Sequence, residues 1–267
     1  MRVVVCAKQV PEPSAPPQLV EGSWTLARDG KLVLDDADAV GVEVGLRLVE
    51  AAGDGADDEV VLVSMAPRAE VSGLRAGLAM GAHRAVLVTD DALAGSDALA
   101  TAKVLAAVMR RLDPVDAVIA GTESTDGYTG VMPAQLAELL GLPSLTFARR
   151  VVVEGGAGAR LLRAERQTED GHDDVSCALP CLVTVTSGAV APRYPSFKGI
   201  VGARTKPLEV LSLADLGLDP SSVGWAGAGQ EIVAVEQAAS RRSGEVVEDD
   251  GTGHERIVAL LERLKVV

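Results

Sequence analysis

Basic residues are in short supply in this sequence. Its 267 residues include 25 Lys and Arg against 38 Asp and Glu, which gives a formal net charge of −13 at pH 7. Binding to nucleic acid requires clustered positive charge, and attraction to an anionic membrane surface requires the same. The charge balance therefore argues against a nucleic-acid partner and against a membrane-surface partner.

Long apolar runs are also missing. No stretch approaches the roughly 18–20 apolar residues that a membrane-spanning helix needs. The N-terminal sequence MRVVVCAK reaches a lysine after five apolar residues, and this pattern predicts a first β-strand rather than a signal peptide. We therefore expect no membrane insertion and a cytoplasmic protein.

Cysteine is scarce, with three residues at positions Cys6, Cys177 and Cys181. An odd number of cysteines in apolar surroundings indicates buried free thiols in a reducing compartment rather than a disulfide framework. The spacing Cys177-x3-Cys181 lacks the second Cys or His pair that a metal site requires. The sequence therefore predicts no metal site.

The common catalytic signatures are absent as well. The sequence contains no GxxxxGK(S/T) phosphate loop, no GxSxG nucleophile elbow and no HExxH metal motif. Its three histidines, His83, His172 and His254, lie far apart in polar or loop settings, so no catalytic set can be assembled around them. We expect no catalytic residue in this chain, and a function as a carrier, a sensor or one subunit of a larger assembly.

Apolar runs alternate with helical patterns in the first half of the chain. Continuous apolarity, as in Val60–Val63, favours parallel strands that are covered on both faces. This rhythm predicts an α/β fold with a mostly parallel, doubly wound sheet. The expected strands are Val3–Ala7, Glu59–Met65, Ala85–Thr89 and Val115–Ala120, and the expected helices run from Asp35–Asp38 to Ala52, from Arg68 to Met80 with Gly81 at the end, and from Ser96 or Asp97 to Leu112.

The pattern changes after residue 150. Val151–Glu154 and Arg160–Arg166 flank a glycine run over residues 155–158, which is typical of a β-hairpin. Val175–Ala178 and Leu182–Val185 add further strands. The glycine run is not GxGxxG and leads to no helix, so we reject a dinucleotide-binding fingerprint there.

Composition predicts a domain boundary near residue 219. Residues 1–218 form the expected α/β nucleotide-binding domain, while residues 219–251 are rich in Gly, Ser, Asp and Glu and are typical of an extended arm. Thr252 and Glu255 have the spacing of a capping box. One face of the helix that follows is apolar, with Ile257, Leu260, Leu261 and Leu264. We expect this terminal helix either to fold back on its own sheet or to dock on another chain.

The stretch GTESTDGYTGVMP, Gly121–Pro133, is the strongest candidate for a binding site. It joins an expected strand to a helix over Ala134–Leu140, and this is the position at which open α/β sheets bind ligands. Its glycines allow backbone amides to approach a phosphate, and the helix directs its positive end at the loop. Because the loop has Glu123 and Asp126 but no Lys or Arg, we expect amides and hydroxyls to hold a phosphate and carboxylates to suit ribose. The alternative is an ordinary turn with solvated acidic residues.

Aromatic residues make up only 2% of the chain, yet Tyr194 and Phe197 lie three residues apart among Pro192, Pro195 and Gly199. Pro and Gly disfavour a helix, so the pattern predicts a surface loop. Large apolar rings on a loop are typical anchors of protein interfaces. The alternative is that both rings pack beneath the loop against the sheet.

Several motifs, in order along the chain, resemble the β subunit of electron transfer flavoprotein. They are MRVVVCAKQVPEP, LRAGLAMGAHRAVLV, GTESTDGYTG, LLGLPSLTFARRV, RAERQTEDG, APRYPSFKGIVGA and LADLGLD, and they span essentially residues 1–219. The loop ESTDG resembles a subfamily that is common in bacteria. The resemblance implies a heterodimer in which the α subunit holds the redox FAD, while the β subunit holds AMP and wraps its C-terminal arm around the partner. It also implies electron transfer from flavin dehydrogenases, such as acyl-CoA dehydrogenases, to a quinone reductase or another acceptor.

The resemblance further implies two sets of binding residues. By position, the AMP contacts would be Cys6, Asp35, Asp36, Ala37, Asp38, Met65, Gly121, Thr122, Glu123, Ser124, Thr125, Asp126, Gly127, Tyr128, Thr129, Gly130, Val131 and Met132. The segment that recognises the dehydrogenase would be Arg193, Tyr194, Pro195, Ser196, Phe197, Lys198, Gly199 and Ile200, with Phe197 inserted into a pocket of the partner.

The chain departs from the family pattern at Ala39, where Glu is usual, at Thr122, where Lys is common, and at Ala191, where Glu is usual. These departures bear on the phosphate contacts and on the choice of dehydrogenase. Two alternatives stay open at this point. A second FAD replaces AMP in electron-bifurcating members, and the same α/β core would also suit a stand-alone adenine-nucleotide-binding sensor.

Overall fold

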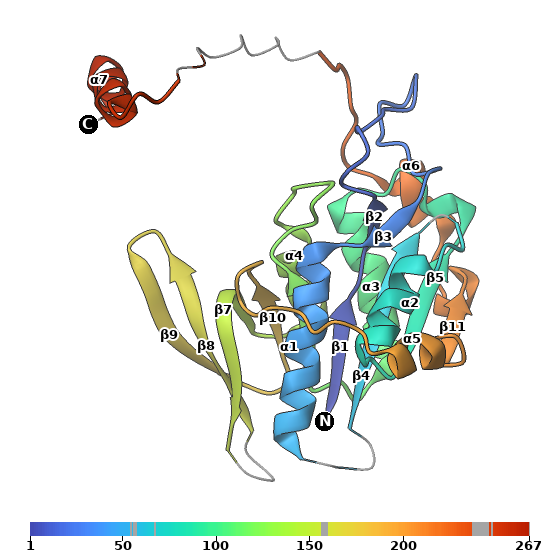
Figure 1. Ribbon diagram of the computed structural model, residues 1–267. Helices are drawn as coiled ribbons and strands as arrows, with labels where there is room; N and C mark the ends of the chain where they lie inside the picture. Colours follow the sequence, from blue (N-terminus) through green and yellow to red (C-terminus); the bar gives the residue numbers. More distant parts are fainter. Residues whose placement is uncertain are drawn as a thin grey trace. The chain divides into compact units, whose positions relative to one another are not determined.

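The computed structural model describes residues 1–53, 55, 58–66, 68–155, 160–236, 246 and 248–266 (Figure 1). These residues divide into two compact units, Met1–Ile232 and Val233–Val267. Within the described residues, no helix is both long enough and apolar enough to cross a membrane.

The first unit is built on one large sheet, for which the described residues supply nine strands. The strands from β11 to β7 run parallel, and β8 and β9 continue the sheet as antiparallel strands. The predicted α/β class with a mostly parallel sheet is therefore confirmed. In spatial order the strands are β11 (Leu208–Leu211), β5 (Arg84–Thr89), β4 (Glu59–Ala66), β1 (Arg2–Cys6), β6 (Ala117–Gly121), β10 (Cys181–Val185), β7 (Ser144–Glu154), β8 (Leu161–Thr168) and β9 (Gly171–Ala178).

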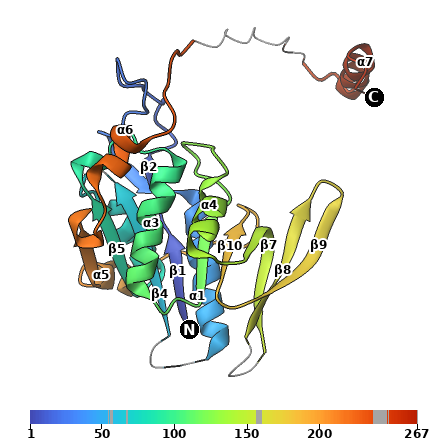
Figure 2. The same cartoon turned by 180° about the vertical axis from the view of Figure 1, so that it is seen from behind.

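Helices cover both faces of the parallel part of the sheet. One face carries α1 (Asp36–Ala52), α2 (Ser72–Met80) and α5 (Phe197–Ala203), as Figure 1 shows. The other face carries α3 (Ala98–Leu112) and α4 (Met132–Leu140), which lie in front in Figure 2. The sheet is therefore doubly wound, as its sequence pattern predicts.

Alternate residues of each central strand enter opposite halves of the core. In β1, Val3 and Val5 pack toward α1 and α2, while Val4 and Cys6 pack toward α3. Because both faces are covered, each position in such a strand must be apolar, which explains the continuous apolar runs. Gly77 lets α2 approach β4 closely, since a Cβ there would lie 2.7 Å from Leu62 Cδ1.

Aspartate side chains begin two of the predicted helices. Asp35 accepts a hydrogen bond from the Ala37 amide at the start of α1, and Asp97 accepts one from the Ala100 amide at the start of α3. Both caps confirm the predicted helix starts. The helix α2 begins at Ser72 rather than at Arg68, because the Glu70 carboxylate holds the Val71 and Ser72 amides in a turn.

Several strands were not predicted or are longer than predicted. A small antiparallel pair, β2 (Gln9–Pro11) and β3 (Leu32–Leu34), flanks the proline-rich loop. The strand β7 begins at Ser144, earlier than the predicted Val151, and it pairs with β8 as the predicted hairpin requires. Most of the glycine run at the hairpin turn, residues 156–158, falls outside the described residues.

The boundary between the two units lies after Ile232, not after residue 218. Val223 is fully buried in the first unit, and the Gly224 amide donates to Ser96 Oγ at 2.9 Å. The intervening residues form the short elements η3 (Pro220–Ser222) and α6 (Gly224–Gly227), after η1 (Asp91–Leu93) and η2 (Ala214–Leu216) earlier in the chain. A few well-placed contacts therefore order a segment whose composition is typical of a linker.

The second unit contains the helix α7 (Gly253–Arg263), which confirms the predicted terminal helix. The predicted capping box does not form: the Thr252 side chain caps no helix amide, and its Oγ1 donates to Asp250 Oδ1 at 2.6 Å. Ile257, Leu260 and Leu264 are exposed on α7.

Candidate nucleotide-binding site

The strands β1 and β6 form the topological switch point of the sheet, and the region beyond their carboxyl ends is called the crevice below. They are parallel neighbours, and the chain leaves β1 toward the α1 face but leaves β6 toward the α4 face. Loops that diverge to opposite faces leave a gap at the end of the two strands, and open α/β sheets bind ligands at such points. The loop between β6 and α4, residues 122–131, lies at this edge and is called the β6–α4 loop below.

Asp38 connects the segments that meet in this crevice. Its buried carboxylate accepts a hydrogen bond from the backbone amide of Lys8, after β1, at 2.6 Å. It also accepts one from the amide of Gly121, at the end of β6, at 3.4 Å. Burial raises the pKa of Asp38 to about 7, although the amide hydrogen bonds act in the opposite direction.

Asp35 attaches the β6–α4 loop to the start of α1. Its side chain is fully buried, and one carboxylate oxygen caps the helix. The other oxygen accepts hydrogen bonds from the amide and the hydroxyl of Thr125 at 2.8 and 3.1 Å. Three donors, one from α1 and two from the loop, thus meet at one carboxylate, which fixes the loop backbone at the start of the helix.

Positive charge reaches the β6–α4 loop from elsewhere in the chain. Lys8 Nζ donates to Asp126 Oδ1 at 2.7 Å and to Ser124 Oγ at 3.1 Å, and the Arg28 guanidinium pairs with the other Asp126 oxygen. Burial acts to raise the pKa of Asp126, but Lys8 and Arg28 outweigh it and hold this pKa below its ordinary value. The expectation that a phosphate at this loop would meet no cation is therefore wrong.

The two cations were missed because nothing near the loop in the sequence indicates them. Lys8 lies two residues after β1, which indicates a place at the carboxyl edge but not a contact with Asp126, whereas Arg28 lies in the long connection between β2 and β3. Their side chains remain 40% and 34% exposed, while that of Asp126 is 5% exposed. A bound anion can therefore reach both cations from the solvent side.

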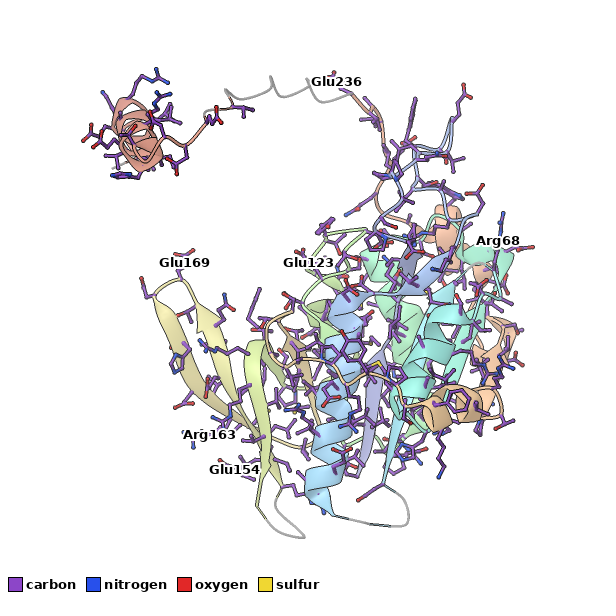
Figure 3. The ribbon with its side chains drawn as sticks, in the orientation of Figure 1. Arg68, Glu123, Glu154, Arg163, Glu169 and Glu236 are labelled. Atoms are coloured by element: carbon purple, nitrogen blue, oxygen red, sulfur yellow. The ribbon has the colours of Figure 1, made fainter. Side chains whose placement is uncertain are left out.

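The outer part of the β6–α4 loop presents backbone amides. The amides of Thr129, Gly130 and Met132 donate no hydrogen bond to another described residue. Gly130 has a left-handed backbone with φ of 64°, which brings this turn to the start of α4. The helix has no side-chain cap there, so its positive end is open to an anion. Glu123 is exposed on the same loop (Figure 3).

The structure brings most of the predicted nucleotide contacts to this one edge. Cys6 ends β1, Asp35 to Asp38 begin α1, and the loop residues follow β6. Met65 lies one strand further along, near the end of β4. Burial raises the pKa of Cys6 to about 12, so this residue contributes a neutral thiol.

The three cysteines lie in the first unit. Cys6 and Cys181 are buried, Cys177 is half-buried, and all three are free thiols. In the part of the chain that the structure describes, no group of three His, Cys, Asp or Glu side chains is arranged to hold a metal ion.

The predicted partner-binding residues, Arg193–Ile200, lie apart from the crevice and are called the recognition segment below. Tyr194 and Phe197 are 96% and 83% exposed, so the alternative in which both rings are buried is wrong. The predicted loop ends early, because α5 begins at Phe197 with Ser196 as its cap. Arg193 does not face solvent as a free charge, since it pairs with Glu43 and Glu50 of α1.

Comparison with known proteins identifies the family. Residues 23–216 match the family model described as "Electron transfer flavoprotein domain", which is more than half of the chain. The chain belongs to the electron transfer flavoprotein family, as a beta subunit. It is 38% identical to "Electron transfer flavoprotein subunit beta" of Mycobacterium tuberculosis (strain ATCC 25618 / H37Rv) over 267 residues, which covers 99% of each chain.

Two further relatives are similar to this beta subunit over nearly its whole length. It is 34% identical to the electron transfer flavoprotein subunit beta of Thermoanaerobacterium thermosaccharolyticum, over 99% of this chain and 98% of the relative. It is 31% identical, with the same coverage, to "Caffeyl-CoA reductase-Etf complex subunit CarD" of Acetobacterium woodii. Membership of this family implies an electron-transfer role and an α-subunit partner.

Proposed function

We propose that this beta subunit holds AMP in the crevice between β1 and β6 and pairs with an α subunit that holds the redox FAD. The heterodimer would carry electrons from flavin dehydrogenases of the acyl-CoA dehydrogenase type to a quinone reductase or another acceptor, in the cytoplasm. The observation that carries the nucleotide assignment is the convergence of Lys8 and Arg28 on Asp126, beside open amides of the β6–α4 loop.

The donor set in the crevice suits a nucleotide phosphate. Two cations, the loop amides and the positive end of α4 offer charge and hydrogen bonds to phosphate oxygens. Bound AMP would supply no redox chemistry, so its contribution would be to the stability of the loop and of the subunit. Asp35 and Asp38 would act by fixing the loop backbone on α1.

A second candidate is a second FAD in place of AMP. The relative from A. woodii is named as a subunit of a caffeyl-CoA reductase complex, and this favours testing a more elaborate electron-transfer role. FAD contains an adenine nucleotide, so the same phosphate donors would serve either ligand. A stand-alone sensor is disfavoured by the match over 99% of the chain to a protein named as a subunit of electron transfer flavoprotein.

Nucleotide analysis of the purified heterodimer tests this proposal. The beta subunit is co-expressed with its α subunit, the complex is denatured, and the released nucleotides are separated and quantified. One AMP and one FAD per heterodimer are expected. Two FAD without AMP would favour the second candidate, and a complex that releases no nucleotide beyond the FAD of the α subunit would contradict the assignment of the crevice. The isolated beta subunit supplies a check, because bound flavin absorbs near about 450 nm whereas AMP does not.

We further propose that the recognition segment docks on the dehydrogenase, with Phe197 as its anchor. The exposure of both rings in a chain that is 2% aromatic supports this assignment. Aromatic anchors are frequent centres of protein interfaces.

A further inference from the structure

The recognition segment combines exposed rings with a firmly held backbone. Tyr194 and Phe197 are almost fully exposed, yet polar contacts with α1 and α2 fasten the chain on both sides of them. An exposed anchor on a flexible loop would lose conformational freedom when a partner binds, which weakens binding. A rigid support avoids that loss, so the residues that provide the support bear on partner affinity.

Arg193 provides the support on the side of α1. Its Nε donates to Glu43 Oε2 at 2.7 Å, and its Nη1 donates to Glu50 Oε1 at 2.6 Å. Its backbone amide also donates to Glu43 Oε2 at 3.2 Å. Glu43 and Glu50 are seven residues apart and so lie on one face of α1. Figure 1 shows the chain between β10 and α5 crossing this helix.

The charge of Glu43 makes this contact specific for arginine. Its side chain is 3% exposed, and Arg47 donates to it as well, at 2.7 Å. Burial acts to raise the pKa of Glu43, but hydrogen bonds from Arg193 and Arg47 outweigh it, so the pKa lies below its ordinary value. A planar guanidinium can bind two carboxylates in fixed directions, which an ammonium group cannot do.

The other end of the segment is fixed on α2. A Cβ at Gly199 would lie 2.5 Å from the carbonyl oxygen of Ala79, so α5 sits directly against the end of α2. Arg75 donates to the carbonyl oxygen of Ala203, at 2.7 Å, and Lys206 Nζ donates to that of Ala82, at 2.6 Å. The aromatic rings thus project from a segment that is held at both ends.

We propose that Arg193 is a positioning residue for recognition of the electron donor. Its contacts with Glu43 and Glu50 hold the segment in the conformation that presents Tyr194 and Phe197, and the guanidinium itself does not touch the partner. This inference rests on the proposed docking of a flavin dehydrogenase at the recognition segment.

The test uses the intact heterodimer with a purified acyl-CoA dehydrogenase from the same organism, reduced by its acyl-CoA substrate. The rate of flavin reduction is measured against heterodimer concentration for wild type, Arg193→Gln, Phe197→Ala and the double variant. We expect Arg193→Gln to raise KM about tenfold and to change kcat less than about twofold, because it affects binding and not the transfer step. In the Phe197→Ala background, where Tyr194 alone is left to be positioned, Arg193→Gln should raise KM by a smaller factor than it does in the wild type.

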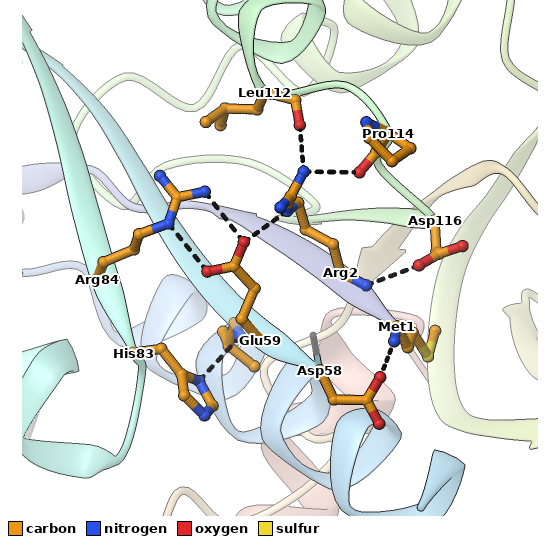
Figure 4. Close-up of polar contacts among 10 residues, drawn as sticks. Met1, Arg2, Asp58, Glu59, His83, Arg84, Leu112, Pro114 and Asp116 are labelled. Atoms are coloured by element: carbon orange, nitrogen blue, oxygen red, sulfur yellow. Dashed lines mark hydrogen bonds and ion pairs between the residues drawn. The ribbon is translucent and has the colours of Figure 1, made fainter. Parts of the chain in front are cut away.

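Arg84→Gln is the matched control. Like Arg193, Arg84 pairs with a glutamate; it donates two hydrogen bonds to the half-buried Glu59, at 2.9 and 3.0 Å, at the amino edge of the sheet (Figure 4). The Arg84→Gln variant should lower the melting temperature as much as Arg193→Gln does, while its KM stays at the wild-type value. AMP content should be unchanged in both variants. A KM raised equally by the control would show that general loosening, not positioning, explains the effect.

The remaining outcomes separate this inference from the proposal on which it rests. If Phe197→Ala raises KM and Arg193→Gln does not, the segment docks the dehydrogenase but Arg193 does not position it. If the two substitutions multiply in the double variant, Arg193 contacts the partner independently, and the positioning role is refuted. If neither substitution changes KM, the recognition segment is not the docking site, and both the docking proposal and the positioning role of Arg193 are refuted.

Discussion

Asp38 should make the stability of this chain depend on pH in an uncommon direction. Its pKa in the folded state is about 7, compared with an ordinary value of 3.8. Between these two values the folded chain retains a proton that the unfolded chain has lost, so the free energy of unfolding falls as pH rises. A shift of roughly three units corresponds to about 4 kcal/mol, lost progressively between about pH 4 and pH 7.

The substitution Asp38→Asn removes this dependence. Asparagine retains an acceptor for the Lys8 amide, the shorter of the two hydrogen bonds at 2.6 Å, and gives up the one to Gly121 at 3.4 Å. Near pH 5 the variant should therefore be about 1 kcal/mol less stable than the wild type. Near pH 8, where the wild type holds a buried carboxylate, the variant should be about 1.5–2 kcal/mol more stable.

Urea denaturation of the wild type and of Asp38→Asn, at equal protein concentration and at several pH values, measures the difference between their free energies of unfolding. Titratable groups that both proteins share cancel in the difference between the two free energies of unfolding. One of them is His83, whose pKa is lowered by burial and by Lys206, so that its contribution to stability rises with pH, opposite to that of Asp38. Asp36→Asn, at an exposed position in the same helical turn, controls for the loss of one negative charge. A constant difference for Asp38→Asn from pH 5 to pH 8 would refute the reasoning.

Three further predictions address binding. A Cβ at Gly127 would lie 3.0 Å from Ser124 Oγ and 3.6 Å from Lys8 Nζ. Gly127→Val should therefore lower the amount of AMP recovered from the heterodimer and shift the melting temperature by no more than about 2–4 °C. Full AMP content would place the nucleotide elsewhere. Arg28→Gln should weaken AMP binding at least about tenfold by calorimetry, or about 1.4 kcal/mol, and an unchanged Kd would leave Arg28 only as a partner of Asp126. Deletion after Asp250 removes Ile257, Leu260 and Leu264, each of which contributes roughly 1.5–3 kcal/mol to assembly if it is buried on the α subunit. Assembly should therefore weaken by orders of magnitude, while the first unit still unfolds cooperatively. Loss of that cooperativity would assign the helix to the core.

Local sequence predicted the central sheet well because local physics decides it. The apolar run of β4 must be continuous, since Val61 and Leu62 face opposite covered sides of the sheet. Asp35 and Asp97 were recognisable as helix caps because each bonds an amide only two or three residues away. In such places the sequence neighbourhood and the spatial neighbourhood are the same.

Long-range contacts were out of reach for the same reason. Arg28 and Lys8 meet Asp126 across about a hundred residues, so a loop that lacks basic residues in sequence still lies next to two cations. Val223 orders a glycine-rich segment through burial that its composition does not indicate. The rule that Pro and Gly exclude a helix also failed near Phe197, because Pro195 precedes the cap and Gly199 is needed for close approach to Ala79.

The helix α1 supports both proposed sites without any evident means of coupling them. Its start holds the β6–α4 loop through Asp35 and the end of β6 through Asp38, while Glu43 and Glu50 hold the recognition segment. Asp38 and Glu50 are separated by roughly 18 Å along the helix at 1.5 Å per residue. Between them α1 lies close against β1, where a Cβ at Gly45 would be only 3.1 Å from Val5. A helix packed this tightly has no room to shift as one body, so changes at one site should not reach the other. Nucleotide content and dehydrogenase affinity should therefore respond to separate sets of substitutions.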